Sequence, residues 1–222
     1  IEQEHRLTWD QCAAAMKENY QSPSANRTRA VLKTSRHFGY GGGLGDDWAV
    51  RISKDFTQRV SSHRTPNGYL MIPGLFSWAN TIMLGQQVGA TPNGRYAGTP
   101  VSHGANPDPG FRKDAALTAM SDAIASVQPG LGNTAPFQLE LNTTLVVHDD
   151  AVNNIISVIK THFEQGGTLI NANVISGQQI LEAYQDPSKY PDLVVRVTGF
   201  TAYFATLSPE FRKLVAERII NM

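Results

Sequence analysis

The stretch LVVRVTGFTAYF, residues 193–204, carries the pattern on which the interpretation of this chain depends. Its first part, Leu193–Val197, is a short and nearly continuous apolar run, which predicts a strand buried on both faces. Thr198 and Gly199 end this run, and three aromatic residues follow before residue 205. Taken by itself, a glycine at this place predicts a tight turn that needs a positive φ or a close approach of the backbone.

The residues around this stretch alternate between expected strands and expected helices. Residues 137–147 alternate apolar and polar side chains, which is the period of a half-buried strand. The expected elements are a strand over 137–147, a helix over 150–165 ending at Gly166-Gly167, a strand over 168–175, a helix from Ser176, and a last helix after Ser208-Pro209. Strands that alternate with helices predict an α/β fold.

The first half of the chain is rich in glycine and proline and predicts helices joined by turns. The expected elements are a helix over 9–20 capped by Thr8, a helix beginning at Asp46-Asp47, turns at Thr65–Gly68 and Thr91–Gly94, a helix around 75–87 that we expect to be buried, and a helix over 114–128.

Composition excludes several classes of protein. The 222 residues carry 19 Lys and Arg against 19 Asp and Glu, and this zero net charge argues against nucleic acid or an anionic membrane as partner. No apolar run approaches the roughly 18 residues of a transmembrane helix. The one cysteine, Cys12, excludes a disulfide framework and favours a reducing, cytoplasmic compartment. Because the chain begins at Ile1 without a signal segment, we expect its start to differ from a translation start.

Common catalytic motifs are missing from the sequence. The glycine cluster at 39–45 lacks the Lys-Ser/Thr that follows a phosphate-binding loop and predicts a turn. The histidines show no metal-ligand spacing, so we expect no bound metal. No serine lies in a nucleophile elbow, and Cys12 has no neighbour that would activate it, so we expect it to be a packing residue.

Two polar side chains interrupt the apolar strand expected over 168–175. Asn171 and Asn173 lie on the same face of that strand, since side chains alternate along it. Buried amides need specific partners, whereas exposed amides are satisfied by water. The spacing alone favours neither possibility.

The stretch RVTGFTAYF, residues 196–204, resembles the signature of the glycyl radical enzymes, the family that includes pyruvate formate-lyase. Gly199 occupies the position of the radical glycine. GGTLINANV (166–174), DPSKYPDLVVRVTG (186–199) and GATPNGRYAGTPVSHGANPDPG (89–110) are also similar to segments of that family, and LTWDQ and HFGYGGGLGDD match it more weakly. The resemblance spans nearly the whole chain.

This resemblance implies a chemistry that uses backbone instead of side chains. In the family, an S-adenosylmethionine-dependent iron-sulfur activating enzyme removes a hydrogen atom from the glycine Cα. The flanking amide groups delocalise the unpaired electron, and the radical then passes to a cysteine that attacks a small organic substrate. The protein itself therefore binds no cofactor, but carries an oxygen-sensitive organic radical suited to anaerobic metabolism.

The resemblance also implies that this chain is incomplete as an enzyme. Family members are several times longer, and Cys12 does not match the loop of their radical-accepting cysteine. We therefore expect a C-terminal piece or a small subunit, partnered by a larger cysteine-bearing chain and by the activating enzyme. By the same comparison, residues 1–100 would be the C-terminal part of an α/β barrel domain and residues 101–222 the glycyl radical domain.

Several functions remain open within and outside this family. The tail after Gly199 favours a lyase of the fumarate-adding hydrocarbon succinate synthase type. The alternatives are an arylacetate decarboxylase, a formate acetyltransferase-type lyase and a spare-part radical subunit. Outside the family, a non-catalytic α/β binding module would explain Gly199 as a simple turn.

The resemblance further implies where the residues around the radical should lie. Gly199 should occupy a buried loop near the barrel centre, because nearby apolar side chains such as Phe200 would be costly to expose at roughly 25 cal/mol per Å². Thr198 and Phe200 flank it, and Arg196 should fix the loop or its recognition by the activating enzyme. Asn171 and Asn173 should lie beside the loop, with at least one of them hydrogen-bonded to the backbone.

Overall fold

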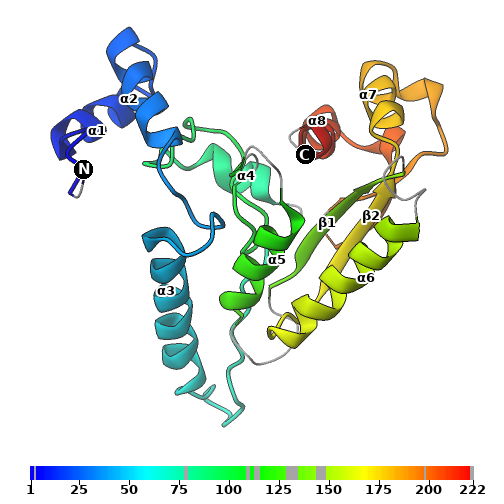
Figure 1. Cartoon of the computed structure of the whole chain (residues 1–222), viewed down its shortest axis with the longest axis horizontal. Helices are drawn as coiled ribbons and strands as arrows, with labels where there is room; N and C mark the ends of the chain where they lie inside the picture. Colours follow the sequence, from blue (N-terminus) through cyan, green and yellow to red (C-terminus); the bar gives the residue numbers. More distant parts are fainter. Residues whose placement is uncertain are drawn as a thin grey trace. The chain divides into compact units, whose positions relative to one another are not determined.

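We describe the protein from a computed structural model, in which residues 1–2, 4–77, 80–108, 111–112, 116–128, 135–143, 149–197 and 199–220 are described (Figure 1). Its helices are α1 (Trp9–Lys17), α2 (Pro23–Lys33), α3 (Leu44–Ser61), α4 (Thr81–Gln86), α5 (Leu117–Ser126), α6 (Asp149–Glu164), α7 (Gly177–Gln185) and α8 (Pro209–Ile220). Its strands are β1 (Phe137–Asn142), β2 (Ile170–Ile175), β3 (Val194–Arg196) and β4 (Thr201–Tyr203). In this described part of the chain, no helix is both long and apolar enough to cross a membrane.

The chain forms two compact units that do not follow sequence order. Residues Ile1–His37 and Asn80–Val101 form the first unit, and Phe38–Ala79 and Ser102–Met222 form the second. The division at residue 100, which the family resemblance implies, stays a prediction about domains.

The first unit is held by a small core between its helices. The core residues are Cys12, Ala15, Tyr20, Ala25 and Leu32. Thr8 caps α1 through the expected capping box. The expected helix over 9–20 is too long, because α1 ends at Lys17 and the chain then turns through Asn19 and Tyr20 at positive φ. This turn buries Tyr20, whose hydroxyl donates to the carbonyl oxygen of Thr91 at 2.7 Å.

Two further differences concern helices in the first unit. The sequence analysis missed α2, although Ser22 and Pro23 supply its N-cap and its first position. The helix expected around 75–87 is only the short α4, and the prediction that it is buried was wrong, since Met83 and Leu84 are exposed. The buried residues of α4 are instead Thr81 and Gly85.

Both expected Pro-Asn-Gly turns are present. They are closed by hydrogen bonds from the N–H of Gly68 to the carbonyl oxygen of Thr65 and from the N–H of Gly94 to the carbonyl oxygen of Thr91.

A loop of glycines opens α3 in the second unit. The Asp46 carboxylate accepts hydrogen bonds from the backbone N–H groups of Gly39, Gly41 and Gly43. A side chain of the protein thus fills the place where a phosphate-binding loop would hold its anion. This contact supports the turn that the sequence predicts and leaves these amide groups occupied.

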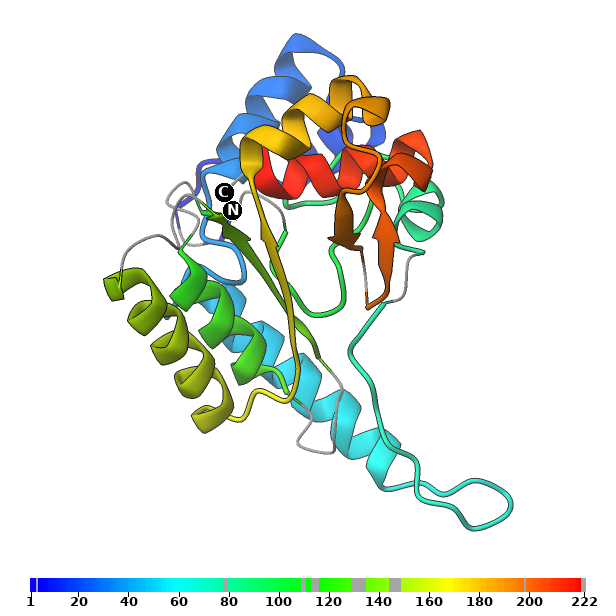
Figure 2. The same cartoon turned by 90° about the vertical axis from the view of Figure 1, so that its right-hand side faces the viewer.

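Strands β1 and β2 form a parallel pair joined by α6, with Phe137 opposite Ile170 and Glu140 opposite Asn173. Figure 2 shows α5 and α6 side by side along these strands. They cover the apolar face, where Phe137 and Leu139 pack with Ile124 and Val158. The connection between parallel strands needs a crossover, which α6 provides.

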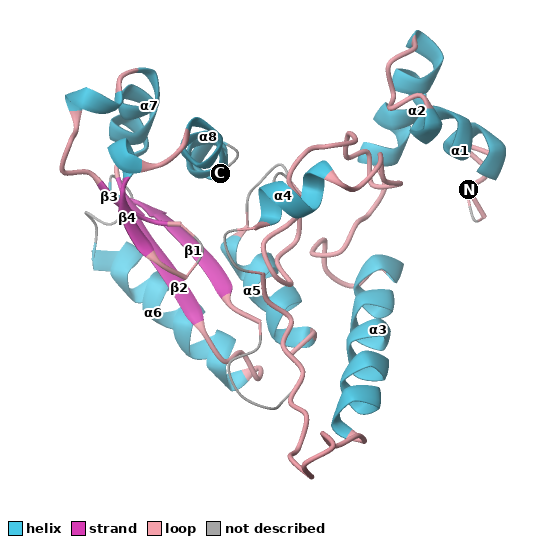
Figure 3. Ribbon diagram, turned by 180° about the vertical axis from the view of Figure 1, so that it is seen from behind, coloured by secondary structure: helices cyan, strands magenta, loops and turns pink. Residues whose placement is uncertain are grey.

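The hairpin formed by β3 and β4 lies beside β2, and α7 and α8 lie next to each other near the end of the strands (Figure 3). A second core binds these elements together through Ile180, Val195, Val197, Phe204 and Val215. The prediction that Leu193–Val197 is buried on both faces was wrong. Val195 and Val197 are buried, but the neighbouring Val194 is 45% exposed. The reason is that β3 belongs to an antiparallel hairpin, and only one face of this hairpin is covered by the core.

The expected glycine cap at the end of α6 is present. Gly166 has φ +99°, and the N–H groups of Gly166 and Gly167 donate to the carbonyl oxygens of Phe163 and His162, as in a Schellman motif. His162 is fully buried, and its Nδ1 lies 3.0 Å from the hydroxyl of Ser121 on α5. Gly167 lies directly against this ring, so the cap also fixes how α6 packs on α5.

This packing predicts a large effect of a small substitution. A Cβ at position 167 would lie 2.2 Å from the His162 ring and 2.6 Å from its carbonyl oxygen. We expect Gly167→Ala to lower the free energy of unfolding by about 1–3 kcal/mol, as overpacking does. Urea unfolding monitored by circular dichroism measures this.

Gly74→Ala is the matched control, because its Cβ would meet only Phe76 at 3.9 Å. Equal stability of the two variants would contradict the proposed packing.

Candidate radical site

Gly199 lies in the turn that joins β3 to β4. The turn is closed by the N–H of Val197, which donates to the carbonyl oxygen of Phe200 at 2.9 Å. Gly199 has φ +91°, a conformation that side chains with a Cβ rarely adopt. An added Cβ would meet nothing within 4 Å, so glycine is required here by the backbone conformation and not by lack of space.

The turn is exposed in this chain. Gly199 is exposed, and the apolar side chains of Val194, Phe200 and Tyr203 on the same hairpin are 45%, 41% and 53% exposed. The family resemblance implies a buried loop near the centre of a barrel that a larger chain or upstream sequence completes. Burial of Gly199 therefore stays a prediction about a larger assembly.

Asn173 on β2 anchors the base of this hairpin. Its Nδ2 donates to the carbonyl oxygen of Arg196 at 2.8 Å, and its Oδ1 accepts from the N–H of Arg196 at 2.6 Å. The side chain thus pairs with β3 as a neighbouring strand would. Asn171 lies on the same face of β2 and is also buried, so the sequence question of burial or exposure is resolved in favour of burial.

A buried ion pair lies beside Asn173. Nη1 of Arg218 on α8 donates to Oε1 of Glu140 on β1 at 3.1 Å, and the two side chains are 14% and 10% exposed. Burial raises the pKa of Glu140, while Arg218 and a hydrogen bond with the side chain of Asn173 oppose that rise. Glu140 lies opposite Asn173 in the strand register, so the pair lies next to the residue that anchors the hairpin.

Further polar groups, at His103, Asn106 and Gln138, form a polar layer together with Arg218 on this side of the sheet. The N–H of Gln138 donates to Asn106 at 3.1 Å, and Asn106 donates to the carbonyl oxygen of His103 at 2.7 Å. Burial, followed by the nearby Arg218 charge, lowers the pKa of His103 to about 4, so its ring is neutral at pH 7. Atoms of Arg218, His103 and Gln138 in this layer are buried without a hydrogen-bond partner among the described residues.

The remaining predicted site residues differ in what the structure says of them. Arg196 is half-buried, and its Nη1 donates to the Thr201 hydroxyl at 3.1 Å across the hairpin. Phe200 follows the glycine and is exposed. Thr198 lies outside the described residues. Their roles toward a radical stay predictions.

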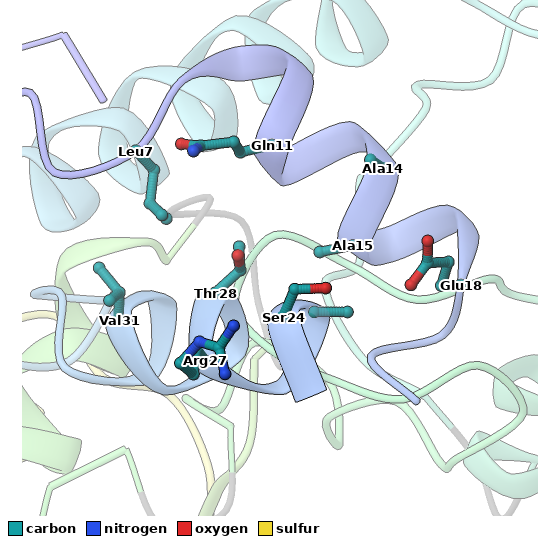
Figure 4. A pocket seen from close by; sticks show the side chains of 10 residues that line it. Leu7, Gln11, Ala14, Ala15, Glu18, Ser24, Arg27, Thr28 and Val31 are labelled. Atoms are coloured by element: carbon teal, nitrogen blue, oxygen red, sulfur yellow. The ribbon is translucent and has the colours of Figure 1, made fainter. Parts of the chain in front are cut away.

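Other parts of the chain offer less chemistry. Cys12 is buried in the core of the first unit, and burial raises the pKa of its thiol, as expected of a packing residue. Within the described ranges, no three His, Cys, Asp or Glu side chains gather as a metal site would need. A pocket of about 340 Å³ lies between α1 and α2, lined largely by small side chains with Glu18 and Arg27 among them (Figure 4).

Sequence reasoning missed two residues of this site. Glu140 follows the alternation of β1, and Arg218 lies in the last helix, 78 residues further along the chain. Neither belongs to a local motif. The alternation does place Glu140 on the polar face of β1, and this face is the only sequence signal that could have pointed to it.

The comparisons with known proteins fit this geometry. The family model described as glycine radical matches residues 101–205, a range that includes Asn173, Arg196 and Gly199. This part of the chain therefore resembles a glycyl radical domain.

The chain also matches solved structures in which this domain is part of a longer protein. A protein of 1,2-propanediol dehydration in Roseburia inulinivorans is 27% identical, with a TM-score of 0.86 over 96% of this chain and 28% of that chain. The B12-independent glycerol dehydratase of Clostridium butyricum is 26% identical, with a TM-score of 0.85 over 97% and 27%. A glycyl radical enzyme of Archaeoglobus fulgidus is 24% identical, with a TM-score of 0.81 over 94% and 27%. The chain thus spans about a quarter of the length of these relatives.

The conformation of Gly199 predicts how this position tolerates substitution. Because φ is positive, we expect Gly199→Ala to lower the free energy of unfolding by about 1 kcal/mol. Gly199→Asn should cost less, since asparagine adopts positive φ more readily than alanine. Urea unfolding of both variants measures this difference, and an equal or absent loss would contradict a turn limited by its backbone conformation.

Proposed function

We propose that this chain is the radical-storing part of a glycyl radical enzyme, with Gly199 as the residue that holds the unpaired electron. The observation that carries the proposal is Gly199 at positive φ in a hairpin whose base is fixed by Asn173, within the matched glycine radical domain. Removal of one Cα hydrogen atom leaves a planar centre that the two flanking peptide groups stabilise. A residue with a Cβ would be strained in this turn.

The proposed reaction needs two partners. An S-adenosylmethionine-dependent iron-sulfur activating enzyme takes the hydrogen atom from Gly199, and an exposed turn is accessible to it. The radical then passes to a cysteine that lies outside this chain, because Cys12 is buried in the core of the other compact unit. Apolar side chains left exposed on the hairpin fit a surface that the remaining enzyme covers.

The comparisons favour a reaction class different from the one that the sequence suggests. Two relatives above 25% identity are described by the dehydration of 1,2-propanediol and of glycerol. We therefore propose the elimination of water from a small polyol as the preferred reaction class, and fumarate addition as the second candidate. In that reaction 1,2-propanediol yields propanal and water, so no oxidant or reductant is consumed. Arylacetate decarboxylation, formate acetyltransferase chemistry and a spare-part role are the other candidates.

Electron paramagnetic resonance tests the radical itself. The complete enzyme containing this chain is incubated without oxygen with its activating enzyme and S-adenosylmethionine. We expect a doublet, because the remaining Cα hydrogen couples to the unpaired spin, and we expect Gly199→Ala to abolish it. A binding module in which Gly199 is only a turn predicts no doublet.

The same activated sample separates the reaction classes. Supplied with 1,2-propanediol or glycerol, it should release an aldehyde, whereas toluene with fumarate should give no adduct. The reverse result would favour fumarate addition. An activated enzyme inert toward all of these would contradict both assignments while leaving the radical in place.

A further inference from the structure

Four residues on four different elements form a continuous buried chain of polar contacts that ends at the radical hairpin. Arg218 on α8 donates to Glu140 on β1, and Glu140 lies directly opposite Asn173 on β2 in the register of the parallel pair. Asn173 in turn binds the main chain of Arg196 on β3, three residues before Gly199. Glu140 and Asn173 are 8% and 6% exposed, so water does not replace these contacts.

Glu140 determines which way the Asn173 amide points. Asn173 lies opposite Glu140 in the strand register, and a carboxylate paired with Arg218 only accepts hydrogen bonds, so it favours the Nδ2 group of the amide on its side. The second Nδ2 hydrogen and Oδ1 then face the carbonyl and N–H of Arg196, as observed. If the amide were turned over, its oxygen would face the carboxylate and both contacts with Arg196 would be lost.

Arg218 supplies the charge that this arrangement needs. Burial by itself favours the protonated form of Glu140, which could donate to Asn173 and remove the preference for one amide orientation. The guanidinium of Arg218 opposes this by favouring the carboxylate. The ion pair therefore joins α8 to β1 and also favours the form of Glu140 that only accepts hydrogen bonds.

The hairpin depends on this anchor because it is short. β3 and β4 have three residues each, and an isolated two-stranded hairpin is marginally stable at best. Val195 and Val197 pack one of its faces into the core, but apolar packing is non-directional and does not by itself select one register along β2. The pair of hydrogen bonds at Arg196 fixes that register.

We propose that Glu140 is a positioning residue for the radical turn, acting through Asn173, with Arg218 as its counter-ion. The inference rests on the proposed function of Gly199, but the positioning of the turn can be measured without the radical.

Amide hydrogen exchange of this chain tests the positioning. We expect Asn173→Ala to speed exchange in the segment 193–204 by about tenfold, since two hydrogen bonds are lost. Glu140→Gln, a milder change that keeps the side-chain shape, should speed exchange several-fold in the same segment and leave α5 and α6 unchanged. Val174→Ala is the control, because the side chain of Val174 is exposed and lies on the face of β2 opposite to Asn173, so this change should leave the hairpin protected. Unchanged exchange in 193–204 for both Asn173→Ala and Glu140→Gln would overturn the inference.

Radical yield in the complete, activated enzyme provides the functional arm. We expect Glu140→Gln to lower the intensity of the resonance doublet, and Glu140→Asp, which keeps the carboxylate, to restore part of it. An undiminished doublet in Glu140→Gln would overturn a role in radical formation. A wild-type enzyme without any doublet would instead contradict the function proposed for Gly199, and the exchange result would still decide whether Glu140 positions the turn.

Discussion

The two hydrogen bonds between the Asn173 side chain and the main chain of Arg196 are the contact on which the candidate site depends. They let a strand of the parallel pair hold a hairpin that is not part of its sheet. The hairpin carries Gly199 at its turn, so the position of one Cα atom follows from the orientation of one amide group.

This contact explains why one face of the β1–β2 pair is polar. Strands of parallel sheets are usually apolar on both faces, because helices cover both sides. Here α5 and α6 cover an apolar face, whereas Gln138, Glu140, Asn171 and Asn173 line the other. Buried polar groups are costly unless they are paired, and the Glu140–Arg218 ion pair and the contact with Arg196 provide partners. On this face of the sheet, directional polar contacts with the hairpin and α8 therefore take the place of apolar packing.

The sequence predicted local features better than their partners. The strand at residues 137–142 and the shared face of Asn171 and Asn173 were predicted correctly, since both follow from the period of a strand. The prediction that the first of these strands is half-buried was wrong, because residues 137–140 of β1 are buried on both faces. Whether the two asparagines were buried depended on β3, which the spacing did not reveal. Leu193–Val197 was expected to be buried on both faces because an apolar run does not tell a central strand from a hairpin that packs on one side. The Glu140–Arg218 contact joins residues too far apart in the chain for any local motif to indicate it.

Mapping of oxygen-dependent backbone cleavage tests the central claim most directly, because it reports the position of the radical and not only its presence. The complete enzyme is activated without oxygen and then exposed to air, and its fragments are identified by mass spectrometry. A radical stored at Gly199 predicts scission at that residue and a released peptide whose sequence begins at Phe200. Cleavage should be absent from the sample that was never activated and from Gly199→Ala. An intact chain after air exposure of a sample that shows the doublet, or cleavage at another residue, would contradict the account.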